Sequence, residues 1–167
     1  LAAVKLARDL ADEYTAKNPD KPRFVAGSVG PTNKTCSMSP DVNNPAYRAL
    51  SYDELAASYQ QQMEAMLEGG VDAILIETIF DTLNAKAAIF AAEQAMKMTG
   101  VEVPIMLSVT VSDIGGRTLS GQTLDAFLAS VQHANIFSVG LNCSFGARQL
   151  KPFLEQLASR APYYISA

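Results

Sequence analysis

Ile136-Phe-Ser-Val-Gly-Leu-Asn-Cys-Ser-Phe-Gly146 is an apolar segment that runs out into a polar, glycine-containing turn. Its first six residues, 136–141, are predicted to form a buried strand, and residues 147–159 have the pattern of a following helix. Asn142 and Cys143 therefore stand at the carboxyl end of a strand, where parallel α/β proteins place their chemistry. A thiol at such a position can serve as a metal ligand or as a nucleophile.

The same alternation of strand and helix extends over the whole sequence. The predicted strands are 23–27, 71–77, 104–111, 136–141 and 163–167, and the predicted helices are 1–17, 51–68, 81–98, 123–134 and 147–159. Successive strands are mostly about 30 residues apart, the length of a βα unit, because a parallel strand must be followed by a crossover. The order predicts an α/β fold with a single parallel sheet.

Two architectures are compatible with five such strands. One is an open, doubly wound sheet, and the other is an incomplete (β/α)8 barrel. A complete barrel takes about 250 residues, so the 167 residues of this chain would make about two-thirds of one. The sequence begins without methionine, and we expect its numbering to start inside a longer protein.

Composition excludes several classes of function. The net charge of −4 and a pI near 4.9 give no basic face for nucleic acid. No apolar run approaches the ~20 residues of a membrane span, and no signal peptide precedes the first helix. The two cysteines make no disulfide framework, so a reducing, cytoplasmic location is expected.

Polar residues follow the predicted strands where each one ends. They include Ser28, Glu77, Asn142 and Cys143. Glu77 comes after four apolar residues, so its carboxylate needs a cation or a hydrogen-bond donor. It could bind a substrate ammonium or act as a general base, or it could form a structural ion pair or cap the next helix.

The cysteines and the histidine are open to more than one interpretation. Cys143 could be a small buried hydrophobe, and one cysteine alone does not make a zinc site, which needs about three protein ligands. Cys36 lies in a long loop and is interpreted as a packing residue. His133 falls late in a predicted helix, away from the strand ends, so no Cys-His dyad is expected.

Three segments together resemble a known family. Phe24-Val-Ala-Gly-Ser-Val-Gly-Pro-Thr32, Gly70-Val-Asp-Ala-Ile-Leu-Ile-Glu-Thr-Ile-Phe-Asp81 and Val139-Gly-Leu-Asn-Cys-Ser-Phe-Gly146 are similar, in order and spacing, to the homocysteine-binding (homocysteine S-methyltransferase) domain of cobalamin-dependent methionine synthase. The resemblance covers residues 1–167 and implies a partial (β/α)8 barrel, from about the third to the seventh strand of eight. The parent protein would be a methyltransferase that makes methionine.

The resemblance also implies a site. That family binds zinc through three cysteines at the carboxyl face of the barrel, and the first of them matches Cys143. The other two form an adjacent pair in a Gly-Gly-Cys-Cys-Gly motif, which this sequence lacks, so they would lie outside the chain. Glu77 is expected to face the substrate amino group, with Gly27, Ser28 and Asn142 close to the substrate.

The partners follow from the same family. They would be homocysteine and the folate-, cobalamin- and activation modules of the same polypeptide, with cobalamin carried on another module. The isolated chain is expected to be inactive. One alternative is a cobalamin-independent homocysteine S-methyltransferase that uses a betaine or sulfonium methyl donor. Another is a stand-alone α/β domain for ligand binding or assembly.

Overall fold

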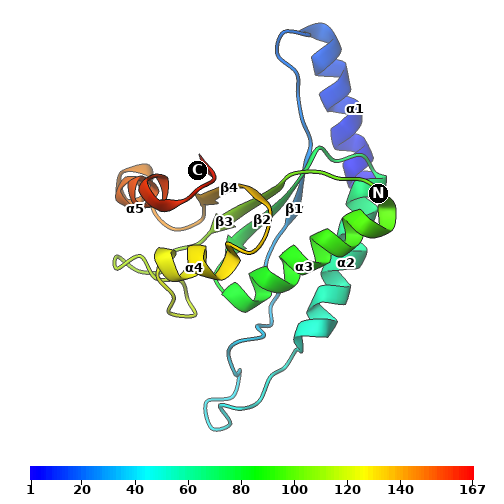
Figure 1. The fold of residues 1–167 in the computed structure, drawn as a ribbon. Coiled ribbons are helices and arrows are strands. Elements are labelled where there is room, and N and C mark those ends of the chain that lie inside the picture. Colours follow the sequence, from blue (N-terminus) through cyan, green and yellow to red (C-terminus); the bar gives the residue numbers. More distant parts are fainter.

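A computed structural model describes all of residues 1–167 and has the predicted alternation of helices and strands (Figure 1). The strands are β1 (Ala26–Val29), β2 (Ala73–Ile79), β3 (Ile105–Val109), β4 (Ile136–Leu141) and β5 (Tyr164–Ser166). The helices are α1 (Ala2–Lys17), α2 (Tyr52–Glu68), α3 (Thr82–Thr99), α4 (Leu124–Val131) and α5 (Ala147–Arg160). No helix is long and apolar enough to cross a membrane.

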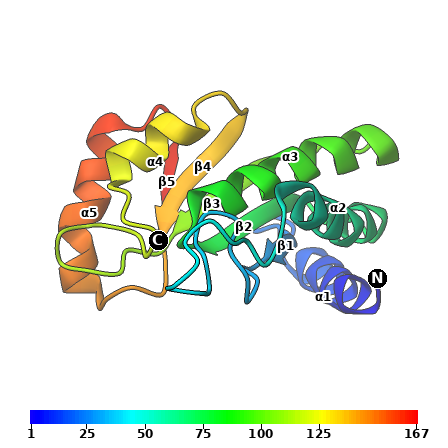
Figure 2. The same ribbon diagram turned by 90° about the horizontal axis from the view of Figure 1, so that it is seen from below.

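The order of strands in the sheet distinguishes between the two expected architectures. The five strands form one parallel sheet in the order β1-β2-β3-β4-β5. A doubly wound sheet reverses its order at a switch point, whereas this sheet advances in one direction only. Right-handed crossovers that all advance in one direction put every connecting helix on the same face. The sheet is therefore an arc of a (β/α)8-type barrel, and Figure 2 shows its strands and helices from a second direction.

Burial along β2 identifies the two faces of the sheet. Ile74 and Ile76 are buried against the helices, whereas Leu75 and Glu77 on the other face are only half-buried. The hydrophobic core lies between the sheet and its helices, with α2 packed against α3 and Phe127 of α4 fully buried. The opposite, concave face is the one that lines the interior of a barrel, and it carries the polar groups described below.

Several predicted boundaries were wrong by two or three residues. Strand β1 begins at Ala26 instead of residue 23, because the preceding Phe24 extends into solvent, and β2 continues past Glu77 to Ile79. Strand β3 ends at Val109 and α4 at Val131, both short of their predicted ends at 111 and 134. The edge strand β5 covers only 164–166 of the predicted 163–167, and it pairs with β4 alone.

The helix ends follow local sequence signals. Ser51 and Glu54 form a capping box at the start of α2: the Glu54 backbone N–H donates to the Ser51 hydroxyl at 3.3 Å, and the Ser51 N–H donates to the Glu54 carboxylate at 2.9 Å. The hydrogen bond from the Ser51 backbone N–H, and after it the bond that the Ser51 hydroxyl donates to the same carboxylate at 2.7 Å, lower the pKa of Glu54. Helix α3 ends at Gly100, whose φ of 70° satisfies a left-handed C-cap.

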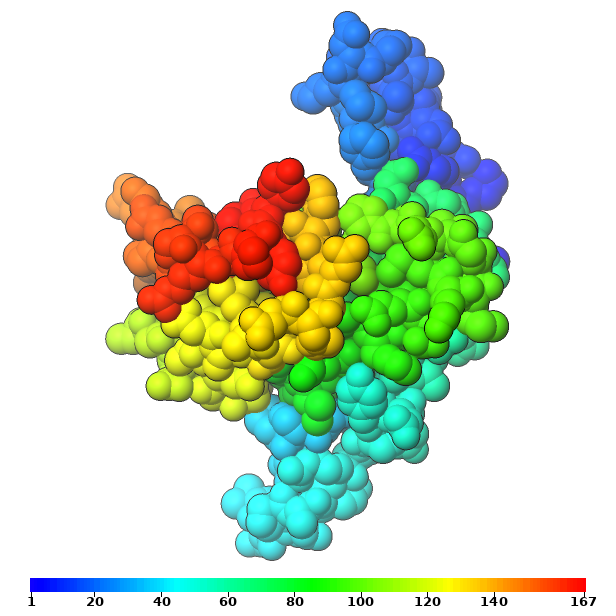
Figure 3. Space-filling model, viewed as in Figure 1, coloured from blue at the N-terminus to red at the C-terminus, as the bar shows by residue number.

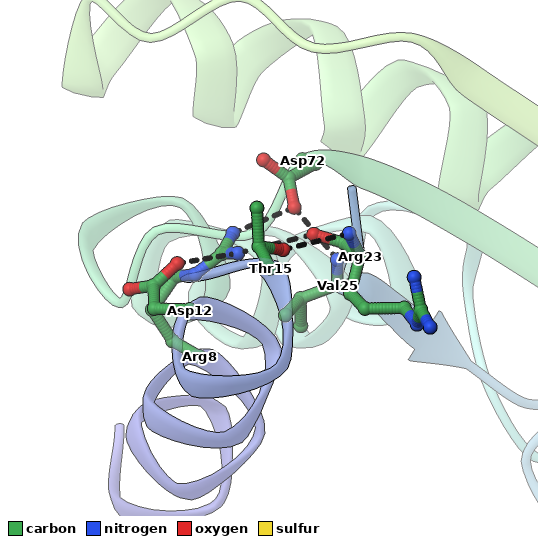
Figure 4. A network of polar contacts seen from close by, with 6 residues as sticks. All are labelled: Arg8, Asp12, Thr15, Arg23, Val25 and Asp72. Carbon is green, nitrogen blue, oxygen red and sulfur yellow. Dashed lines mark hydrogen bonds and ion pairs between the residues drawn. The ribbon is translucent and has the colours of Figure 1, made fainter. Parts of the chain in front are cut away.

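A polar network fastens α1 to the first two strands (Figure 4). One Asp72 carboxylate oxygen accepts from the Arg8 guanidinium at 2.7 Å and from the Val25 backbone N–H at 2.6 Å. The Thr15 hydroxyl accepts from the Arg23 N–H at 2.8 Å. Beyond these contacts the N-terminal segment projects from the body of the molecule, as does the long loop after β1 at the opposite end (Figure 3).

Candidate functional site

The Asn142 side chain joins the carboxyl ends of three strands. Its Oδ1 accepts from the Thr78 backbone N–H in β2 at 3.1 Å and from the Ser108 hydroxyl in β3 at 2.9 Å. Its Nδ2 donates to the Thr78 hydroxyl at 2.8 Å and to the Cys143 sulfur at 3.4 Å. Residues from β2, β3 and the end of β4 are thereby brought together at one end of the sheet.

Two residues of this cluster have strained backbones. Thr78 has φ 57° and Cys143 has φ 54°, and they are the only non-glycine residues of the chain with positive φ. This conformation is a genuine outlier for a β-branched residue, and each such residue costs about 1–3 kcal/mol. Because surrounding contacts must offset that cost, strain of this kind is typical of functional sites.

Glu77 is held by a neighbouring strand and has no cationic partner. The Ser28 hydroxyl of β1 donates to Glu77 Oε1, and Ser28 lies beside Leu75 in the register of the sheet. Neither structural alternative expected for Glu77 is realised. It takes part in no ion pair, and the cap of the following helix is Asp81. A half-buried carboxylate with one hydrogen-bond donor and no cation is suited to bind a cationic group.

Cys143 is exposed at the same end of the sheet. Its sulfur lies 3.9 Å from the Thr78 hydroxyl, four positions before α5 begins at Ala147. The alternative of a buried hydrophobic cysteine is therefore wrong for this residue. No three His, Cys, Asp or Glu side chains of the chain lie close enough to hold a metal ion together. A zinc site needs about three protein ligands, so the residues of this chain do not form one by themselves.

The other candidate residues lie away from this cluster. Cys36 is buried, and its backbone N–H donates to Asn84 Oδ1 at 2.8 Å. Burial raises the pKa of the Cys36 thiol, as expected for a packing residue. His133 is exposed in the turn after α4, just before β4 begins, and therefore lies away from the carboxyl ends of the strands as expected.

Gly27 has a packing role on the helix-facing side of β1. A Cβ at this position would lie 2.8 Å from the Met66 sulfur and 3.3 Å from Val71. The missing side chain therefore allows α2 to approach the sheet. The expected backbone contact of Gly27 with a substrate stays a prediction.

No sequence pattern indicated how the long loop after β1 is held. Asp81 is almost fully buried and accepts from the backbone N–H groups of Leu83 at 2.9 Å and Asn84 at 3.2 Å. The same carboxylate accepts from the Ser37 hydroxyl, and the Asn84 amide donates to the Lys34 carbonyl at 3.0 Å. The Asp-x-x-Asn spacing at the start of α3 is a signal for the cap, but its loop partners are more than 40 positions away.

A large pocket lies at the other end of the strands. It has a volume of about 1120 Å³ and is lined by the end of α3 and the beginnings of β3, β4 and β5. In barrels this end serves stability, whereas ligands bind at the carboxyl ends. It contains neither the strained residues Thr78 and Cys143 nor Glu77, so we assign the candidate site to the Asn142 cluster.

The chain is therefore part of a (β/α)8-type barrel: its five strands form an arc of the barrel sheet, and its polar groups gather at the carboxyl ends of the strands. The model of the family described as homocysteine S-methyltransferase matches residues 1–167. The chain belongs to this family, and the resemblance seen in the three sequence segments is thereby confirmed.

Solved structures support the fold. The apo form of the homocysteine methyltransferase MmuM from Escherichia coli is 22% identical, with a TM-score of 0.76 over 98% of this chain and 55% of that one. The oxidised form is also 22% identical, with a TM-score of 0.72 over 98% and 54% of the two chains. The chain therefore spans about half the length of these enzymes.

Proposed function

We propose that this chain is the middle part of a homocysteine S-methyltransferase barrel, and that its strand ends supply one side of the homocysteine site. Family membership over the whole chain carries the proposal. A stripe of apolar side chains on α1 supports it: Leu6, Leu10 and Tyr14 recur every four residues and are about half or more exposed. In a closed barrel, a preceding βα unit would cover such a face.

Glu77 is the proposed partner of the homocysteine ammonium group. Its carboxylate has one hydrogen bond, from Ser28, and no cation within the chain. Ser28 would orient the carboxylate, and the second oxygen would accept from the ammonium. Gly27 would contribute to the wall of the same site through its backbone, and Asn142 would lie close to the substrate, behind Thr78 and Cys143.

Cys143 is the proposed contribution of this chain to a zinc site. The resemblance requires two more cysteines, which would have to come from polypeptide outside this sequence. Zinc would supply a Lewis acid that keeps the homocysteine sulfur as a reactive thiolate near neutral pH. Exposure of the Cys143 sulfur beside the strand ends supports this assignment.

For the methyl donor we propose methylcobalamin, replenished from methyltetrahydrofolate by other modules of the same polypeptide, in the cytoplasm. The three sequence segments that resemble methionine synthase support this choice. The competing donors are a betaine or a sulfonium compound, used without cobalamin.

The test is methyl transfer by the full-length protein to homocysteine, with methylcobalamin, a betaine and a sulfonium compound as separate donors. Formation of methionine with methylcobalamin, and with neither of the other two donors, would support the proposal. Turnover with either small donor but not with methylcobalamin would replace it with the cobalamin-independent alternative. No turnover with any of the three by a folded, zinc-loaded protein would refute the methyltransferase assignment.

A further inference from the structure

The hydrogen-bonding capacity of the Asn142 side chain is fully used inside the protein. A carboxamide has two acceptor positions on oxygen and two N–H donors on nitrogen. Oδ1 accepts from the Thr78 N–H and the Ser108 hydroxyl, and Nδ2 donates to the Thr78 hydroxyl and the Cys143 sulfur. A substrate atom could bind this amide only by displacing one of the four partners.

The partners of Asn142 coincide with the strained positions. Three of the four bonds go to Thr78 or Cys143, the two residues with positive φ. The Thr78 N–H is turned out of the regular ladder, where the register between β2 and β3 shifts between Ile76 and Ile79. Because Oδ1 accepts this displaced N–H, the bond offsets part of the cost of the left-handed turn.

The backbone of Asn142 is fixed as firmly as its side chain. Its N–H donates to the Val109 carbonyl at 3.1 Å, and its carbonyl accepts from the Thr110 hydroxyl at 3.1 Å. The Ser144 hydroxyl also donates to this carbonyl and accepts from the Val111 N–H at 2.8 Å. Cys143 is thus held between two residues that are both tied to the end of β3.

We propose that Asn142 is a positioning residue: it holds Thr78 and Cys143 in their left-handed conformations and thereby fixes the Cys143 sulfur relative to the Glu77 carboxylate. It acts through these residues instead of contacting homocysteine. The consequence for catalysis rests on the proposed function, whereas the consequence for the backbone of Thr78 does not.

The first test is hydrogen–deuterium exchange of the full-length protein, followed in peptides that contain Thr78. Asn142→Ala removes the acceptor of the Thr78 N–H, so exchange there is expected to accelerate at least tenfold. Asn142→Asp keeps a carboxylate oxygen in the acceptor position and should stay within threefold of wild type. Exchange at Thr78 that stays within twofold of wild type in Asn142→Ala would overturn the proposal.

The second test separates positioning from substrate contact. Asn142→Asp leaves Thr78 supported but loses the N–H donated to sulfur, so kcat is expected to fall at least tenfold while the KM for homocysteine stays within threefold. A tenfold rise in KM at unchanged kcat would identify Asn142 as a substrate ligand instead. If Asn142→Ala does not fold, the kinetics of Asn142→Asp still distinguish a positioning residue from a substrate ligand.

The matched control is Asn135→Asp, which makes the same charge change at the exposed, opposite end of β4. It should leave exchange at Thr78 and both kinetic constants at wild-type values. If the wild-type protein transfers no methyl group to homocysteine, the proposed function fails, and the exchange experiment still decides whether Asn142 holds Thr78.

Discussion

The replacement Glu77→Gln tests the proposed ammonium contact. Glutamine keeps the shape of the side chain and an oxygen that can accept from Ser28, but it removes the negative charge. A hydrogen bond to a charged group contributes about 1.5–3 kcal/mol. Because Glu77 is only half-buried, solvent screens the interaction and the lower half of that range applies.

This energy converts directly into a change in affinity. Each 1.4 kcal/mol corresponds to about a factor of ten, so the KM for homocysteine is expected to rise about 10–40-fold. Ser28→Ala removes only a neutral donor that orients the carboxylate, for which about 0.5–1.5 kcal/mol and a 2–10-fold rise are expected. The KM of each variant for homocysteine would be measured by steady-state kinetics of the full-length protein at saturating methyl donor.

The matched comparison uses 4-mercaptobutanoate, which lacks the amino group of homocysteine. Wild type should bind this analogue poorly, and Glu77→Gln should bind it no worse than wild type does, since no ammonium is present to lose its partner. An equal loss of affinity for both thiols would refute the assignment, because it would mean that Glu77 supports the site without contacting the ammonium group.

Further experiments test the packing of Gly140, the ionisation of Tyr59, and the zinc binding and association of the isolated chain. Gly140→Ala would place a Cβ 2.2 Å from the Ser166 carbonyl oxygen, so the free energy of unfolding measured in urea should fall by about 1–3 kcal/mol. Gly30→Ala is the control, because a Cβ there would have no atom within 4 Å other than those of its chain neighbours. Equal losses in the two variants would contradict the clash. Burial raises the pKa of Tyr59 to about 12, so its contribution to stability is complete below pH 10 and about 2–3 kcal/mol is lost as the pH rises from 10 to 12. Tyr59→Phe should lose less stability over that interval in a denaturation series, and an unchanged pH dependence would count against the burial effect. The isolated chain offers Cys143 as a single ligand and should not retain zinc on dialysis; stoichiometric, tightly bound zinc would oppose this. Because β1 and β5 each leave one sheet edge unpaired, the isolated chain should also associate, and a monomeric elution with a cooperative melt would be evidence against that.

The candidate site was partly predictable. The carboxyl ends of parallel strands meet at one edge of a sheet, so Glu77 and Cys143 could be assigned to that edge from the order of elements alone. The pairing of Ser28 with Glu77 could not, because it depends on the register between β1 and β2. Asn142 was expected near the substrate, but its four hydrogen bonds join it to Thr78 in β2, Ser108 in β3 and the adjacent Cys143, and Thr78 is 64 positions away.

The amino-acid sequence alone predicts the succession of strands and helices, the capping box at Ser51 and Glu54, and the polar residues that follow the strands. Each of these depends on side-chain periodicity or on contacts within a few positions. Two other features became visible only in the folded chain: the sheet advances in a single direction as an arc of a barrel, and Thr78 and Cys143 adopt left-handed backbones around Asn142. Both outcomes require contacts between separate strands to outweigh local preferences, and no local pattern encodes that balance.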